Sequence, residues 1–156
     1  MPVIEELTEQ SDAETLAAIA AVEEQLGRLV SHVRASVRDA AAAIDPALQP
    51  FGLKLLRLLA RCGPLHAGAA AEALIVDKSV ISRQVRALED LKLLELQPDP
   101  ADGRVRILAL TPFGSEQLAL ARMKDKEMVH RRLGAWPNED LNQLATLLAR
   151  LTATVE

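Results

Sequence analysis

The chain has 156 residues, of which 49 % are apolar, so it can bury a hydrophobic core and fits one domain, or a small domain plus an assembly element. No apolar run approaches the roughly 20 residues that cross a bilayer, and the N-terminus has no basic region followed by an apolar block. The single cysteine, Cys62, has no partner for an internal disulfide, so the sequence predicts a cytoplasmic protein.

The formal net charge of −4 is unevenly distributed along the chain. Residues 1–24 contain seven acidic residues and no Lys or Arg, and the remainder contains 18 basic and 15 acidic residues. Binding to a polyanion depends on where the basic side chains lie, so the acidic total excludes no nucleic-acid partner.

The chain is expected to begin with a long helix. Residues 1–14 are acidic and are expected to be flexible. From Thr15 to Ile44 there is no proline, and apolar residues recur at helical spacing over about eight turns, until Pro46 marks the end. Residues 51–63 form a second predicted helix, which the Gly63-Pro64 pair closes.

Two short helices follow, over residues 68–74 and 78–93, with a tight turn between them that contains Ile75. Asp77 occupies the position of an N-cap, where its carboxylate would accept hydrogen bonds from the first free amides. The order helix–turn–helix is typical of DNA-binding domains.

Residues 95–97 and 104–110 alternate between apolar and polar, and the segment between them is rich in Pro, Asp and Gly. This pattern predicts a two-stranded hairpin with a protruding loop. A helix is predicted from Pro112, after Thr111, to residue 133, and a last helix over 139–154 with Asn138 as its N-cap.

The helix over 78–93 separates polar from apolar side chains on a helical wheel. One arc of about 140° holds the donors and two distal acids, which are Lys78, Ser79, Ser82, Arg83, Arg86, Glu89 and Asp90. The opposite arc is apolar apart from Gln84 and holds Val80, Ile81, Val85, Ala87, Leu88 and Leu91. The donors lie in the first two-thirds of the helix, which is the part that meets base edges when a helix enters the major groove.

An amphipathic surface helix has a polar face in any protein, so this helix alone leaves a solvated face as an equal alternative. The hairpin adds a second basic element, because its alternation sends Arg104 and Arg106 to the same face. A loop tip with Asp102, Gly103 and Arg104 has the size to enter a minor groove, whose negative potential favours arginine. Together the two elements favour DNA binding.

The segment AEALIVDKSVISRQVRALEDLKLLELQPDPADGRVRILALTPFG resembles the DNA-binding core of the MarR family of bacterial transcriptional regulators. The most specific parts are VDKSVISRQVRALE, PDPADGR and LALTPFG. The resemblance implies a mainly α fold with a small β-hairpin wing: a winged helix-turn-helix DNA-binding domain over residues 46–111, flanked by dimerisation helices over 15–45 and 112–156. It also implies an obligate homodimer on a pseudo-palindromic operator, a minor-groove role for Arg104 with Asp102 orienting nearby arginine, and a small aromatic or phenolic effector, whose contact residues the sequence does not identify.

Several positions depart from the family pattern. Ile75 stands where the family has a residue that tolerates positive φ, so the turn is expected to be reshaped. His66 stands near the start of the helix over 68–74, where the family often has a capping hydroxyl, and is expected to act as a cap there. Lys92 replaces a frequent glycine, and Leu96-Gln97 stands where arginines are common. We therefore expect weaker non-specific binding and a shallower salt dependence than a more basic relative would have.

The remaining chemistry-bearing residues indicate no other site. His32, His66 and His130 lack metal-ligand spacing, and no phosphate loop, activated nucleophile or carboxylate pair indicates an enzyme, a metal site or a cofactor. Cys62 is favoured as a structural thiol over a redox sensor, since thiol-sensing relatives carry their cysteine elsewhere. The leading hypothesis is a homodimeric, sequence-specific repressor released by a small ligand. The alternative is a winged-helix dimer that acts as a protein-interaction module with weak DNA affinity.

Overall fold

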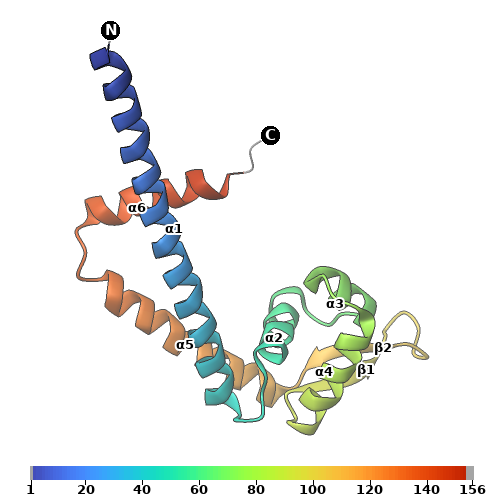
Figure 1. Cartoon of the computed structure of the whole chain (residues 1–156). Helices are drawn as coiled ribbons and strands as arrows, with labels where there is room; N and C mark the ends of the chain where they lie inside the picture. The colour runs from blue at the N-terminus through green and yellow to red at the C-terminus, as the bar shows by residue number, and fades with distance from the viewer. Residues whose placement is uncertain (1, 154–156) are drawn as a thin grey trace. The chain divides into compact units, whose positions relative to one another are not determined.

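The structure is a computed structural model that describes the backbone of residues 2–153 and the side-chain surroundings of residues 12–153. The elements follow in the order α1 (Pro2–Ile44), α2 (Pro50–Cys62), α3 (Ala67–Leu74), α4 (Lys78–Asp90), β1 (Leu94–Pro98), β2 (Arg106–Leu110), α5 (Pro112–Leu133) and α6 (Asn138–Thr152) (Figure 1). The predicted fold class, mainly α with one β-hairpin, is confirmed. The chain divides into two compact units, Met1–Lys54 and Leu55–Glu156, which we describe separately.

In the first unit, α1 begins at Pro2 and not at the predicted Thr15. Residues 3–14 contain no glycine or proline, and proline is tolerated at a first helical position, so nothing in the sequence stops the helix at residue 15. The expected flexibility of residues 1–14 concerns motion and stays a prediction. The helix ends at Ile44, where the Asp45 carboxylate accepts a hydrogen bond of 2.7 Å from the amide of Ala47.

In the second unit, the winged helix-turn-helix is formed by α3, α4 and the antiparallel pair β1–β2, in which Leu94 pairs with Leu110 and Pro98 with Arg106. Leu65 adds a short bridge to β2 through two hydrogen bonds with Leu108, of 3.0 and 2.7 Å. The largest fully buried side chains of this unit are Leu55, Leu56, Ile81, Leu88, Leu93, Leu94, Leu108 and Leu118. The core thus lies between the helices and one face of the hairpin.

Both helices of the helix-turn-helix end in the same left-handed arrangement. Ile75 has φ 56° and Lys92 has φ 57°. After α3, the amide of Ile75 bonds to the carbonyl of Glu72 and that of Val76 to Ala71; after α4, the amides of Lys92 and Leu93 bond in the same way to Glu89 and Leu88. These are the two hydrogen bonds of a Schellman motif. The expectation that Ile75 reshapes the turn was therefore wrong, because the motif holds the backbone in place.

Lys92 also explains why α4 stops at Asp90 and not at the predicted residue 93, since a left-handed residue ends the helical hydrogen bonding. Helix α5 starts at Pro112 as predicted, and the Thr111 hydroxyl accepts a bond of 2.8 Å from the amide of Gly114. In α6, Asn138 is the first helical residue and not the predicted cap, because the carbonyl of Pro137 already accepts the first helical bond, from Leu141. The predicted end of this helix at residue 154 lies outside the described residues.

Candidate nucleic-acid interface

Helix α4 presents its donors to solvent and its apolar side chains to the core. Ile81, Val85 and Leu88 are buried. The five predicted DNA-binding residues, Lys78, Ser79, Ser82, Arg83 and Arg86, are all exposed. Ala87, which the helical wheel places on the apolar side, is exposed as well, and Gln84 is half-buried. The polar face of α4 is therefore free for a partner.

The first turn of α4 is held by backbone bonds. Asp77 has the extended conformation of an N-cap, but its carboxylate makes no cap hydrogen bond, so the predicted capping role was wrong. Its backbone carbonyl already accepts a bond of 2.9 Å from the amide of Val80. The Ser82 hydroxyl donates to the Lys78 carbonyl over 3.0 Å. Ser82 must rotate that hydroxyl before it can donate to a phosphate.

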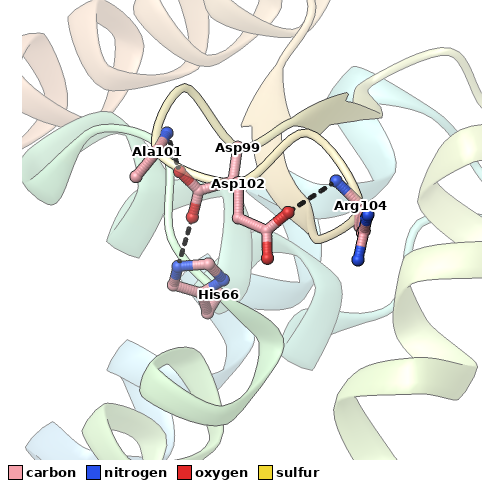
Figure 2. A network of polar contacts seen from close by, with 5 residues as sticks. All are labelled: His66, Asp99, Ala101, Asp102 and Arg104. Atoms are coloured by element: carbon pink, nitrogen blue, oxygen red, sulfur yellow. Dashed lines mark hydrogen bonds and ion pairs between the residues drawn. The ribbon is translucent and has the colours of Figure 1, made fainter.

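The loop between the two strands, residues 99–105, is called the wing loop below, and two aspartates fold it (Figure 2). The Asp99 carboxylate accepts a bond of 2.7 Å from the amide of Ala101, and the Asp102 carboxylate accepts one of 3.0 Å from the amide of Arg104. Such Asx turns fix the direction of the chain after each aspartate. Asp102 thus bonds to the main-chain amide of Arg104; its implied role in orienting arginine stays a prediction.

Backbone bonds close the wing loop at its base, from Asp99 to Val105 and from Val105 to Asp102, each of 2.9 Å. Asp102, Arg104 and Arg106 are all exposed. Arg104 therefore projects from a closed turn, whereas Arg106 is the first residue of β2 and pairs with Pro98.

The structure brings part of the predicted site together around one groove of about 360 Å³ between α4 and the hairpin. Its polar lining consists of Lys78, Ser82, Arg86, Glu89 and Arg106. Ser79, Arg83, Asp102 and Arg104 do not line it. Arg86 of α4 and Arg106 of β2 thus line the same groove, while Arg83 and Arg104 lie outside it.

Sequence reasoning missed one contact of the wing loop. His66 occupies the N-cap position of α3 but makes no cap bond, so its expected capping role was wrong. Its Nε2 lies 2.8 Å from a carboxylate oxygen of Asp99 instead (Figure 2). The two residues are far apart in the sequence, and no local pattern identifies such a pair.

The other chemistry-bearing features of the described residues were also located. Cys62 is exposed and free at the end of α2. Within the described part of the chain, no group of three or more His, Cys, Asp or Glu side chains could hold a metal ion, and no helix is long and apolar enough to cross a membrane.

Comparison with known proteins agrees with this geometry. The sequence profile of the MarR family matches residues 53–105. The uncharacterized HTH-type transcriptional regulator YxaD of Bacillus subtilis (strain 168) is 34 % identical over 97 residues, which are 62 % of this chain and 68 % of YxaD.

Solved structures share the fold at low sequence identity. YusO of Bacillus subtilis has a TM-score of 0.73 at 22 % identity, over 88 % of this chain and 96 % of that chain. RV1404 of Mycobacterium tuberculosis has a TM-score of 0.76 at 20 % identity, over 85 % and 90 %. The apo form of MarR from E. coli has a TM-score of 0.62 at 18 % identity, over 82 % and 97 %. The winged-helix fold, the profile match and the YxaD relationship together place this chain in the MarR family of transcriptional regulators, and it is not an enzyme.

Proposed function

We propose that the protein regulates transcription by binding a specific DNA operator through α4 and the wing loop. The observation that carries the proposal is the exposed row of donors on α4, opposite a buried face, together with Arg104 and Arg106 on the hairpin of the same compact unit. A helix fits the major groove, and an arginine at a loop tip fits the minor groove.

Each donor has a role that follows from its position. Arg83 and Arg86 form bidentate bonds to guanine or hold phosphates, while Lys78, Ser79 and Ser82 hold phosphates. Arg104 enters the minor groove, and Asp102 fixes the main chain before it. Arg106 lines the groove between α4 and the hairpin together with Arg86. There it holds the DNA backbone between the major-groove and the minor-groove contacts.

The regulator acts as a homodimer in this proposal, with residues 15–45 and 112–156 as dimerisation helices. Support comes from apolar side chains that each unit leaves exposed. On α1 these are Leu16, Ile19, Val22, Leu29, Val30 and Val33, and on α6 they are Leu147, Leu148 and Leu151. An apolar surface of this extent is typical of an interface, and a two-fold dimer matches two half-sites of a pseudo-palindromic operator.

The last part of the proposal is that the protein is a repressor and that a small ligand releases it from its operator. A groove of about 470 Å³ lies between α2 and α5, which is the size of a small-molecule site. Leu59, Leu110 and Leu118 give it an apolar lining, and Ser115 and Arg122 supply polar groups. A small aromatic or phenolic effector fits this chemistry. Calorimetric titration of such compounds checks it: binding that Arg122→Ala abolishes supports the groove, and binding unchanged by that substitution contradicts it.

The DNA-binding proposal is tested by titrating the purified protein onto the DNA upstream of its own reading frame at several salt concentrations. A sequence-selective shift, with an affinity that falls as salt rises, supports the regulator. No selective shift even at low salt would contradict it and favour a protein-interaction module with weak DNA affinity. An unrelated duplex of equal length and composition is the control.

A further inference from the structure

The wing loop has one side-chain tie to another element. All the other hydrogen bonds described for residues 99–105 stay within the loop. The exception is Asp99, whose second carboxylate oxygen lies 2.8 Å from Nε2 of His66, at the start of α3 (Figure 2). The Asp99 side chain is 16 % exposed and that of His66 is 52 % exposed, so this contact is partly shielded from water.

The backbone next to His66 is already fixed. Leu65 makes two hydrogen bonds with Leu108 of β2, so the histidine starts from a chain that is paired to the hairpin. Asp99 is equally well placed: its other oxygen bonds to the amide of Ala101, and its own amide bonds to the carbonyl of Val105. A short contact between two anchored groups loses little conformational entropy when it forms. The contact needs no protonated histidine, because the neutral tautomer with hydrogen on Nε2 also donates.

We infer that His66 is a positioning residue for DNA binding, which clamps the wing loop to α3 through Asp99 and so presents Arg104 to the minor groove. The inference rests on the proposed function. Without the clamp, the base of the hairpin stays paired, but the loop that carries Arg104 is held only by its own turns. Binding DNA must then order the loop, and that entropy loss weakens binding.

A positioning role of His66 predicts a loss of DNA affinity without a loss of stability, whereas a purely structural role would lower the stability. His66 makes no cap bond to α3, so its removal takes no hydrogen bond from the helix. His66→Ala should leave the dimer and the melting temperature unchanged and weaken operator binding by about three- to tenfold. His66→Gln, whose amide N–H has about the reach of Nε2, should restore the affinity. His130→Ala, an exposed histidine on α5, is the matched control and should bind as the wild type does.

A double-mutant cycle with Arg104→Ala separates positioning from other effects. If His66 acts by presenting Arg104, its removal should change affinity less than about twofold once Arg104 is already absent. Hydrogen exchange on the free protein gives a readout that needs no DNA: the amides of Ala101 and Arg104 should exchange faster in His66→Ala and recover in His66→Gln.

The outcomes are distinguishable. If Arg104→Ala weakens selective binding and His66→Ala does not, the positioning role is overturned while the proposed function stands. If His66→Ala weakens binding equally in both backgrounds, His66 acts elsewhere and the inference also falls. If the wild type binds no DNA selectively, the proposed function and the positioning role fall together, and exchange then reports only on the contact itself.

Discussion

Ile75 and Lys92 hold a left-handed backbone at positions that usually suit glycine. A left-handed conformation costs a residue with a side chain about 1–2 kcal/mol, and β-branching adds crowding at Ile75. The Ile75 side chain is 92 % exposed, so no burial offsets that strain. The two hydrogen bonds of each Schellman motif stabilise the geometry instead.

Replacing Ile75 with glycine should therefore stabilise the protein. The relief of left-handed strain exceeds the extra freedom that glycine gives the unfolded chain, so we expect the free energy of unfolding to rise by about 1 kcal/mol. Chemical denaturation followed by circular dichroism measures it. Ile75→Val, which keeps the β-branch, is the control and should change little. A lower stability for Ile75→Gly would contradict the account.

Capping shows where residue-level prediction ends. His66, Asp77 and Asn138 were each predicted to cap a helix through the side chain, and none of the three side chains makes a cap bond. Thr111, in contrast, does cap α5. Residue type shows that a cap bond is available, but not whether it forms. His66 instead contacts Asp99, which only the folded hairpin brings near.

At the scale of elements, the start of α5 packs tightly against the backbone of Leu93 at Gly114. A Cβ on Gly114 would lie 2.1 Å from the carbonyl oxygen of Leu93 and 2.8 Å from its carbonyl carbon. Both are backbone atoms, so neither can move aside as a flexible side chain would. The glycine of the LALTPFG motif is thus required because the start of α5 closely approaches Leu93, in the turn that follows α4.

Gly114→Ala should destabilise the protein by about 3 kcal/mol or more, since it forces the start of α5 away from Leu93. The control is Gly68→Ala, because a Cβ there would meet no atom within 4 Å and alanine favours the helix. Thermal unfolding of the two variants beside the wild type measures both effects. Equal melting temperatures for Gly114→Ala and the wild type would show that the contact is not tight.

Most elements could be predicted from local patterns. Helical spacing and Pro or Gly boundaries placed α2, α3 and α5 within one or two residues, and period-two alternation with turn residues identified the hairpin. The start of α1 was predicted wrongly. The boundary at Thr15 was based on the acidic composition of residues 1–14, although no helix-breaking residue lies there. The amphipathic face of α4 was predictable because a wheel needs only the sequence, whereas the groove it shares with Arg106 depends on tertiary packing.

At the scale of the whole molecule, the proposed dimerisation can be tested at the exposed apolar residues of α6, Leu147, Leu148 and Leu151. Leu147 and Leu151 are 49 % and 58 % exposed. Replacing both with aspartate would bury two unpaired carboxylates in the proposed interface, so we expect the dimer dissociation constant to rise by about 100-fold or more. Light scattering at several concentrations measures it, with Gln143→Asp as the control on the same helix. A double variant that stays dimeric would place the interface elsewhere.

The central claim is that the donors of α4 and of the wing loop form one DNA interface. The most direct measurement is fluorescence anisotropy of a labelled duplex from the DNA upstream of the reading frame that the wild type binds selectively. The wild type, Arg83→Ala and Arg104→Ala are titrated onto it, each verified as a dimer. We predict that either substitution weakens binding by about tenfold or more, through lost major-groove or minor-groove contacts. Arg61→Ala, an exposed arginine at the end of α2, should bind as the wild type does. Wild-type affinity for both interface variants would contradict the account.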